Sequence, residues 1–166
     1  MAAQAEVLDE LHRLLARLPQ LTGALAASVD GLVLAQETRG VEPEGLAALT
    51  AAAQGIALRF ADVTGQGDFR ELLVRSAHGY VATYRAGPSA VLTLLAEGRV
   101  NVGRLHLEGR RSGQRISELL GSAVHQPAPA PQQAPATTTG GALPVRTPSA
   151  RADRAPRSAN GEAPNQ

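Results

Sequence analysis

Residues 43–63 place the strongest constraint on the fold, because two different helical faces run along this single stretch. Apolar residues recur at alternating steps of three and four, which places them on one side of an α-helix. Small residues recur every four positions and leave a flat stripe that another backbone can approach closely. We expect the large-residue face to lie on a sheet and the small-residue face to meet a second copy of the chain; an alanine-rich composition is the simpler alternative. The large face holds Leu46, Leu49, Ala53, Ile56, Phe60 and Val63, and the small face holds Ala47, Ala51 and Gly55.

Composition excludes several kinds of chemistry. All 16 basic residues are arginine, so a P-loop lysine, a Schiff-base lysine and a lysine general base are impossible. Cysteine is absent, which excludes disulfides, thiolate metal sites and cysteine nucleophiles. The net charge of +1 gives no reason to expect nucleic acid or an anionic membrane as a partner. If nucleotide chemistry is involved, we expect the nucleotide to be bound by a partner.

No targeting or membrane segment is expected. Charged residues interrupt the apolar residues near the N-terminus, so the continuous core of a signal peptide does not form. No window approaches the length of uninterrupted apolar sequence that a membrane helix needs. We therefore expect a cytoplasmic protein without membrane insertion.

The hydropathy pattern predicts a helix, a hairpin, a second helix, a three-stranded meander and a third helix. Pro19 ends the first helix, Asp30-Gly31 is a strong hairpin-turn signal, and Asn101 can cap the last helix. The stretch 109–113 contains two glycines, so we expect the last helix to be weak or kinked there. The expected helices cover 4–18, 43–63 and 102–122, and the expected strands cover 24–29, 32–36, 68–76, 79–85 and 90–96.

The strand sequences predict the order of the sheet. Strand 90–96 is the most apolar and should be central, whereas strand 68–76 carries charges that suit an edge. Both hairpin strands are apolar on both faces, which indicates that helices cover the sheet on both sides. We predict an α/β (α+β) fold, with a five-stranded antiparallel sheet of order 2-1-5-4-3 between one central helix and two terminal helices.

The composition changes after residue 122. Eight of the eleven prolines lie beyond Ala123, among runs of alanine, glutamine, threonine and glycine with few large apolar residues. Such a segment cannot bury enough surface to offset the entropy lost on ordering. We therefore expect a folded domain over 1–122 and a disordered tail over 123–166.

At this point the residues resemble the Roadblock/LC7 domain family. The resemblance covers about residues 4–122, and its motifs mark a fold rather than a reaction. Two features depart from the family's pattern: the glycine pair in the last helix and the charged edge strand. The matching stretches are LDELHRLLARLPQLTGALAASVDGLVLA, GLAALTAAAQGIA and AVLTLLAEGRVNVGRLHLEGRR.

The resemblance implies a homodimer in which the second helix and the third strand pair with their copies, giving a continuous ten-stranded sheet. If strand 68–76 pairs antiparallel with its copy about Leu73, Glu71 lies opposite Arg75 of the other chain, twice. The alternative is that these charges only protect an exposed edge from aggregation. The expected dimer interface comprises Ala47, Ala51, Gly55, Glu71, Leu73 and Arg75.

The resemblance also implies partners. Bacterial members of the family act with small Ras-like GTPases, by stimulating GTP hydrolysis or beside a GTPase in signalling, and eukaryotic members are scaffolds. We expect a non-enzymatic dimer that binds such a GTPase and changes its nucleotide cycle. Stimulation of GTP hydrolysis is one form that this regulation can take. The alternative is a dimeric scaffold with no effect on hydrolysis. A small-molecule sensor is weaker, because no polar residues converge at one point in the sequence. The candidate partner-binding residues are Glu44, Thr50, Gln54 and Arg59.

No catalytic, cofactor-binding or metal-binding set is expected. Ser28, Asp30 and His78 could form a triad only on paper, because they lack the strand–turn–helix context that exposes a nucleophile. No pair of histidines has metal-ligand spacing. An arginine finger stabilises the transition state of a GTPase, but a solvated arginine is the commoner case at each candidate position. Those positions are Arg39, Arg59, Arg110 and Arg111.

Overall fold

The computed structural model describes residues 2–124, and nearly all of the expected tail lies outside these described residues. Every predicted element is present, and each boundary agrees with its prediction to within three residues. The helices are α1 (Ala2–Arg17), α2 (Pro43–Thr64) and α3 (Val102–Val124), and the strands are β1 (Leu21–Ser28), β2 (Val33–Thr38), β3 (Glu71–Arg75), β4 (Gly79–Arg85) and β5 (Ala90–Glu97).

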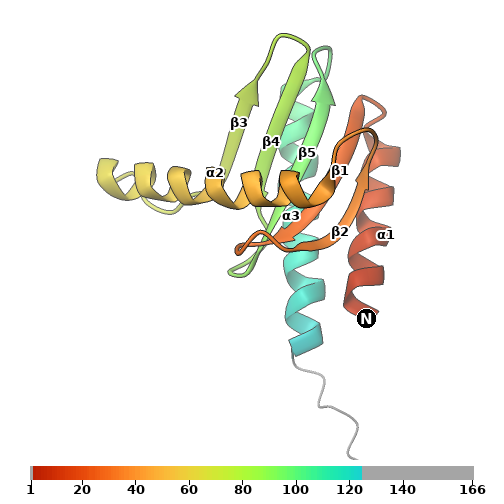
Figure 1. The fold of residues 1–166 in the computed structure, drawn as a ribbon, viewed down its shortest axis with the longest axis horizontal. Coiled ribbons are helices and arrows are strands. Elements are labelled where there is room, and N and C mark those ends of the chain that lie inside the picture. Colours follow the sequence, from red (N-terminus) through yellow and green to blue (C-terminus); the bar gives the residue numbers. More distant parts are fainter. Residues whose placement is uncertain (1, 125–166) are drawn as a thin grey trace, which may run out of the picture. The chain divides into compact units, whose positions relative to one another are not determined.

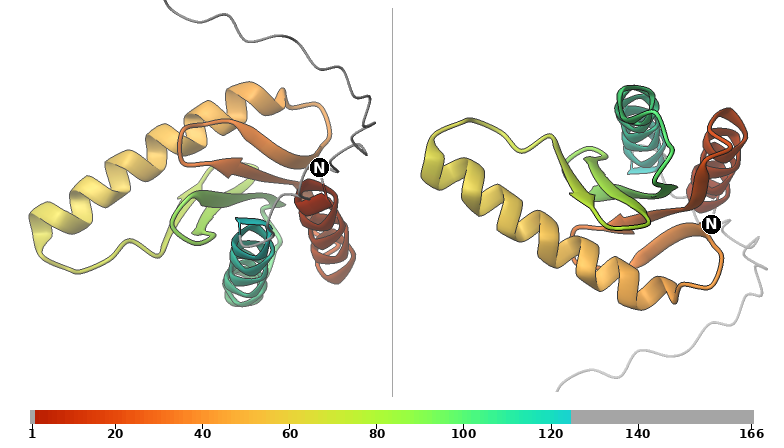
Figure 2. Two further views of the ribbon diagram at one scale, coloured as in Figure 1. Left: turned by 90° about the horizontal axis from the view of Figure 1, so that it is seen from below. Right: turned by 90° about the horizontal axis from the view of Figure 1, so that it is seen from above.

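The strands form one antiparallel sheet in the order β2-β1-β5-β4-β3, which confirms the predicted topology (Figure 1). Helices α1 and α3 lie side by side on one face of the sheet, and α2 crosses the opposite face (Figure 2). The β1–β2 hairpin turns at Asp30-Gly31 as predicted, with Gly31 at a φ of 84° that favours glycine. The structure is therefore a three-layer α+β fold.

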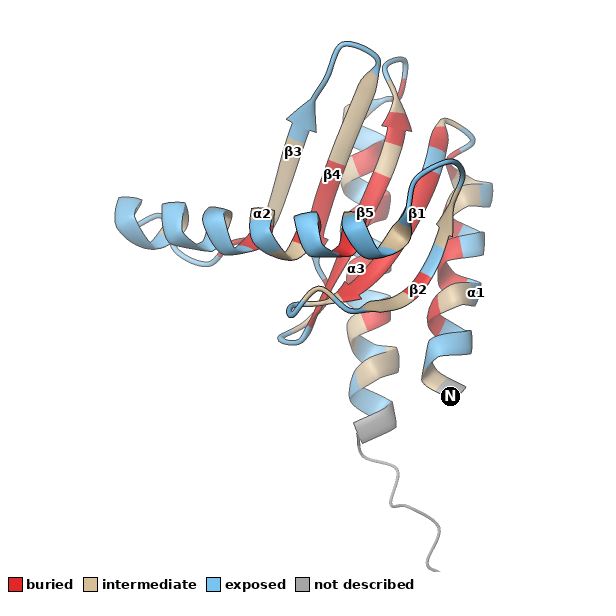
Figure 3. Ribbon diagram, viewed as in Figure 1, coloured by how far each residue is buried: buried red, intermediate tan, exposed pale blue. Residues whose placement is uncertain are grey.

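The main core lies between the sheet and the α1–α3 pair. The two central strands, β1 and β5, are buried on both faces and appear red along most of their length in Figure 3. Burial on both faces was predicted for both hairpin strands, but β2 lies at the sheet edge and only its Ala35 is buried. Helix α1 contributes a stripe of fully buried residues at helical spacing. That stripe consists of Val7, Leu11 and Leu14, and Leu18 continues it just beyond the helix.

A buried polar network joins α1 to α3. Arg17 donates to Glu10 at 3.0 Å, to Glu108 at 2.8 Å and to the Ser112 hydroxyl at 2.9 Å, and Ser112 donates to Glu10 at 2.7 Å. Burial opposes ionisation of Glu10, but the hydrogen bonds from Ser112 and Arg17 outweigh it and hold the pKa of Glu10 below its ordinary value. This cluster fixes the two helices relative to each other.

Helix α3 runs without interruption through the glycines that were expected to weaken it. A Cβ at Gly109 would overlap the buried ring of Tyr84, and one at Gly113 would lie 2.9 Å from the backbone oxygen of Arg85. Both glycines therefore let α3 approach β4 closely, and the packing compensates for their low helix propensity. The expectation of a weak or kinked segment is wrong.

The prediction for which face of α2 lies on the sheet is also wrong. The small residue Ala47 is fully buried against Leu25 and Ala27 of β1, and of the predicted large face only Leu46 packs on this cluster. The large residues farther along the helix are exposed: Leu49, Ile56, Phe60 and Val63. Beneath α2, a Cβ added to Gly31 would lie 3.3 Å from the Ala48 Cα and 3.5 Å from the Ala51 Cβ, so the helix and the hairpin turn approach closely there. The helical periodicity identified the two faces of α2 correctly. Because α2 approaches the hairpin closely, the small-residue face is the one that lies on the sheet.

Two buried threonines connect α2 to the centre of the sheet. The hydroxyl groups of Thr50 and Thr93 are hydrogen bonded at 2.9 Å, and Thr83 lies 3.4 Å from Thr93 on the neighbouring strand. No side-chain polar atom that is buried among residues 2–124 lacks a hydrogen-bond partner. The α2 layer is thus attached to the sheet by small apolar contacts and one polar pair.

The N-terminal half of α2 packs mainly on β1, β2 and β5, and its C-terminal half extends beyond β3 (Figures 1 and 2). Of the helices described over residues 2–124, α2 alone has the length and apolar composition that would allow it to cross a membrane. This corrects the expectation that no stretch approaches that requirement. A helix face that covers another protein surface passes the same test, so the finding by itself is weak evidence for a membrane.

Candidate functional site

Five of the ten exposed large hydrophobic residues within residues 2–124 lie on α2. Leu49 and Val63 are each 69% exposed, Phe60 is 68% exposed and Ile56 is 59% exposed. These residues recur at steps of seven, four and three, so they form one continuous stripe along the helix. Exposed apolar stripes of this extent mark sites where another surface binds.

The stripe continues into a groove beside the edge strand β3. This groove has a volume of about 620 Å³ and lies between the C-terminal half of α2 and β3. Phe60 and Ala61 line it from the helix, and Glu71 and Leu72 line it from the strand. Because β3 pairs only with β4, its outer backbone groups are free to pair with another strand. We call this combined surface of α2, the groove and the β3 edge the α2–β3 surface.

Glu71 on β3 is held by its own chain. Arg110 on α3 binds both of its carboxylate oxygens, at 2.6 and 2.7 Å, and His106 lies 3.4 Å away. The hydrogen bonds from Arg110 hold the pKa of Glu71 below its ordinary value. The cross-chain pairing of Glu71 with Arg75 stays a prediction, and Arg110 would compete with it.

The other two predicted residues of β3 lie in different environments. Leu73 is partly buried and packs against the main core. Arg75 is exposed, and its guanidinium lies 5.9 Å from the centre of the Tyr80 ring on β4. Part of the Leu73 side chain is therefore already covered by its own chain, whereas Arg75 is accessible to a partner.

The predicted small face does not form one exposed surface. Ala47 is fully buried on its own sheet and Ala51 is partly buried, so the first is not accessible to a second copy. Gly55 is exposed, and nothing lies within 4 Å of a Cβ added there. The residues of α2 available for self-association are thus the large apolar ones, which sequence reasoning had assigned to the core.

Two of the four candidate partner-binding residues are wrong. Thr50 and Gln54 are buried beneath α2, where no protein partner can reach them. Glu44 is exposed in the first turn of α2, and Arg59 is exposed and bonded to Asp62 at 2.7 Å. Only Glu44 and Arg59 remain as candidates on this helix.

The arginines considered as fingers lie on different elements. Arg59 and Arg110 form ion pairs within the chain, with Asp62 and Glu71. An arginine already bound to a carboxylate must break that pair before it can stabilise a phosphate. Arg39 and Arg111 form no ion pair among residues 2–124.

Residues 2–124 contain no group of three potential metal ligands. The hydroxyl of Ser28, at the end of β1, accepts a hydrogen bond from the Leu32 N–H at 3.1 Å across the β1–β2 turn. His12 lies 3.4 Å from Glu37 on β2, and the Nδ1 of His106 lies 3.2 Å from the Tyr84 hydroxyl. Each of these two histidine contacts is explained by packing between neighbouring elements.

Comparisons with known proteins agree with this arrangement. The family model described as the Roadblock/LC7 domain matches residues 7–96, which run from α1 to β5. The protein MJ1340 of Methanocaldococcus jannaschii is 29% identical over 101 residues, covering 60% of this chain and 88% of that protein.

Solved structures also share the fold. The gliding protein MglB from Thermus thermophilus superposes with a TM-score of 0.66 at 21% identity, covering 74% of this chain and 93% of that one. A Roadblock/LC7 domain from Streptomyces avermitilis superposes with a TM-score of 0.63 at 24% identity, covering 69% of this chain and 97% of that one. At these identities the likeness concerns the fold alone.

Proposed function

The chain belongs to the Roadblock/LC7 domain family, and from this premise we propose that it is a non-enzymatic homodimer that binds a small Ras-like GTPase and changes its nucleotide cycle. The observation that carries the proposal is the α2–β3 surface, where an exposed apolar stripe adjoins an unpaired strand edge. Both features favour binding of a second protein chain. The apolar stripe exposes side chains that are more stable when covered, and the strand edge exposes backbone groups that another strand can hydrogen bond.

A second copy of the chain fits this surface best. In a twofold dimer, β3 pairs with its copy and extends the sheet to ten strands, while the overhanging half of α2 lies against its counterpart. The apolar stripe of Leu49, Ile56, Phe60 and Val63 then becomes buried. The same two elements pair in the dimers that the family resemblance implies.

The paired helices leave a polar surface for the GTPase. Glu44 and Arg59 stay exposed on α2 and supply charges of both signs. Since the chain lacks lysine and two of its candidate finger arginines are held in ion pairs, we propose that it acts by repositioning residues of the GTPase. The GTPase would then hold the nucleotide and carry out the chemistry.

Oligomeric state is the first test. Sedimentation velocity of the full chain at micromolar concentration should give a dimer. A monomer under these conditions would contradict the proposed use of the α2–β3 surface.

GTP hydrolysis is the second test. Single-turnover hydrolysis by a small Ras-like GTPase from the same genome, measured with and without the dimer, should change in rate. Binding of the GTPase without any change in hydrolysis or nucleotide exchange would support a scaffold instead. In the scaffold alternative the protein is also a dimer, but it does not regulate the GTPase.

A further inference from the structure

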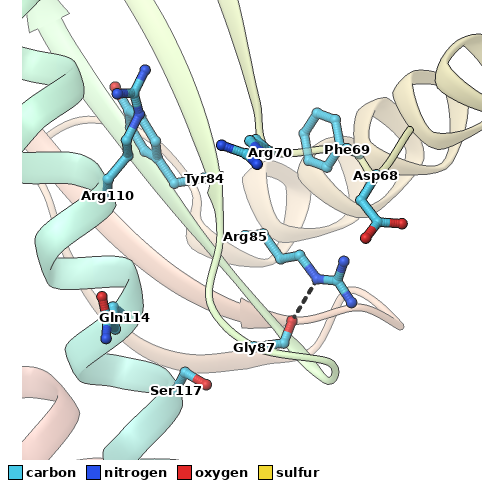
Figure 4. Close-up of a pocket in the computed structure, with 9 residues that line it drawn as sticks. All are labelled: Asp68, Phe69, Arg70, Tyr84, Arg85, Gly87, Arg110, Gln114 and Ser117. Carbon is cyan, nitrogen blue, oxygen red and sulfur yellow. Dashed lines mark hydrogen bonds between the residues drawn. The ribbon is translucent and has the colours of Figure 1, made fainter. Parts of the chain in front are cut away.

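A cavity between β4 and α3 brings together side chains that are far apart in the sequence (Figure 4). Its volume of about 440 Å³ falls within the range of roughly 300–1,000 Å³ that is typical of small-molecule sites. Phe69 and Arg70 line it from the loop before β3, Tyr84 and Arg85 from the end of β4, and Gln114 from α3. Three separate segments therefore build one polar and aromatic pocket.

Two arginines in this cavity lie next to each other without an ion pair to neutralise them. The backbone N–H of Arg85 donates to the backbone oxygen of Arg70 at 3.2 Å, which places the two residues on neighbouring chain segments. Neither side chain forms an ion pair within the part of the chain that the structure describes. The nearby carboxylate of Glu71 is bound by a third arginine, Arg110, and Arg70 acts on it only through longer-range attraction. Neither guanidinium is neutralised by a carboxylate, so both are available to an anion that enters the cavity.

The walls of the cavity are held rigidly. The Nε of Arg85 donates to the Gly87 backbone oxygen at 3.1 Å, which orients the guanidinium. Gly87 has a φ of 84° that favours glycine, and a Cβ there would overlap Ser117 on α3. The buried Tyr84 ring is fixed by Gly109 of α3, as described above. Little ordering entropy would therefore be lost on the β4 and α3 side of the cavity when a ligand binds.

We propose that this cavity binds a small organic oxyanion, in which a phosphate or carboxylate group is attached to an aromatic or apolar body. Arg70 and Arg85 contact the charged group, because guanidinium groups bind both kinds of oxyanion through paired hydrogen bonds. The apolar body lies over Phe69 and Tyr84, which line the cavity but are themselves buried and leave little surface accessible to it. The cavity shares Asp68, Phe69 and Arg70 with the groove of the α2–β3 surface, whereas Arg85 and Gln114 line the cavity alone. Ligand binding can be measured without a GTPase, and sedimentation of the Arg70→Gln variant shows separately whether its dimer is intact.

One acidic residue sets a further condition. Asp68 also lines the cavity and forms no ion pair with either arginine. Its carboxylate would repel an anionic ligand and reduce affinity. The Asp68→Asn substitution removes this charge with almost no change in shape, so it should strengthen binding if the proposal is right.

Isothermal titration calorimetry with the full chain tests the proposal. The probes are phenyl phosphate and phenylacetate, which carry the same ring on the two possible charged groups, so their comparison identifies the preferred one. Arg70→Gln and Arg85→Gln should each weaken binding by about tenfold, since each removes one charge-assisted contact. Asp68→Asn should tighten binding several-fold. Arg39→Gln is the matched control, because Arg39 also lacks an ion pair but follows β2, at the opposite edge of the sheet.

Three results would overturn the proposal: no saturable binding of either probe at millimolar concentration, equal loss in Arg39→Gln and in the two cavity variants, or weaker binding by Asp68→Asn. Thermal unfolding of each variant checks that the fold is intact. All four residues are exposed, so we expect melting temperatures close to that of the unaltered chain.

Discussion

Replacing Phe60 with glutamate tests whether two copies of the chain meet at the outer face of α2. Phe60 is 68% exposed and lines the groove beside β3. A phenylalanine can bury roughly 150–250 Å², so about 100–170 Å² of this side chain remain to be covered. At about 25 cal/mol per Å², covering it contributes ~2.5–4 kcal/mol per protomer. A twofold interface contains the residue twice, but association costs and non-additivity reduce the net effect. We expect the dissociation constant of the dimer to rise by at least about 100-fold, or ~2.7 kcal/mol.

Sedimentation velocity over a concentration series measures this change directly. Leu107→Glu is the matched control, because Leu107 is 64% exposed but lies on α3, across the sheet from α2. The control should sediment like the unaltered chain, whereas Phe60→Glu should shift toward the monomer. Equal dimerisation by both variants would refute the assignment of the interface to α2. A shift caused only by Leu107→Glu would place the interface on the α1–α3 side.

The remaining predictions concern stability. Gly109→Ala should lower the free energy of unfolding by about 1–3 kcal/mol, because its Cβ would overlap the buried Tyr84 ring. Gly55→Ala, in open space on α2, should instead raise it by about 0.5–1 kcal/mol in the same urea titration. Arg17→Met should cost about 2–4 kcal/mol, since it leaves buried carboxylates without their cation, and an unchanged urea midpoint would contradict this. The pKa of Glu10 is lowered in the folded chain, so its stabilising contribution is present above its ordinary value of 4.5 and is lost as the pH falls through the folded value. Urea titrations between pH 3 and 7 should therefore show a smaller acid-dependent loss for Arg17→Met than for the unaltered chain.

The sheet topology could be predicted because each strand carries local information. Strand 90–96 is the most apolar of the five and strand 68–76 is charged, and these properties suit a central and an edge position. The Asp30-Gly31 turn similarly determines the first hairpin. These features depend on neighbouring residues or on composition, so a single sequence contains them.

The orientation of α2 could not be predicted in the same way. Periodicity shows that a helix has two faces, but it does not show which one lies on the sheet. The choice involves the close approach of α2 to the β1–β2 turn, where a Cβ on Gly31 would lie 3.3 Å from the Ala48 Cα and 3.5 Å from the Ala51 Cβ. The exposure of Phe60 and Val63 also runs against the usual rule that large apolar residues form the core of a single chain.

The glycines of α3 and the cavity beside it depend on contacts between distant segments. Gly109 weakens an isolated helix, and only the position of the Tyr84 ring explains why it suits this one. Arg70 and Arg85 are fifteen residues apart in the sequence and become neighbours through one backbone hydrogen bond. Spacing along the chain therefore gave no signal for the cavity.

The hydrogen bond between Thr50 and Thr93 determines how α2 is rotated about its own axis. Apolar attraction has no direction, so an alanine-rich helix could rest on this sheet in several rotations of similar energy. Any other rotation would separate the two hydroxyl groups and lose this buried hydrogen bond. The Thr50–Thr93 hydrogen bond thus contributes more to the orientation of α2 than to the free energy of folding. During evolution, residues on the outer side of α2 can change one by one, and the protein can gain or lose partners, while the inner side keeps the helix facing the same way.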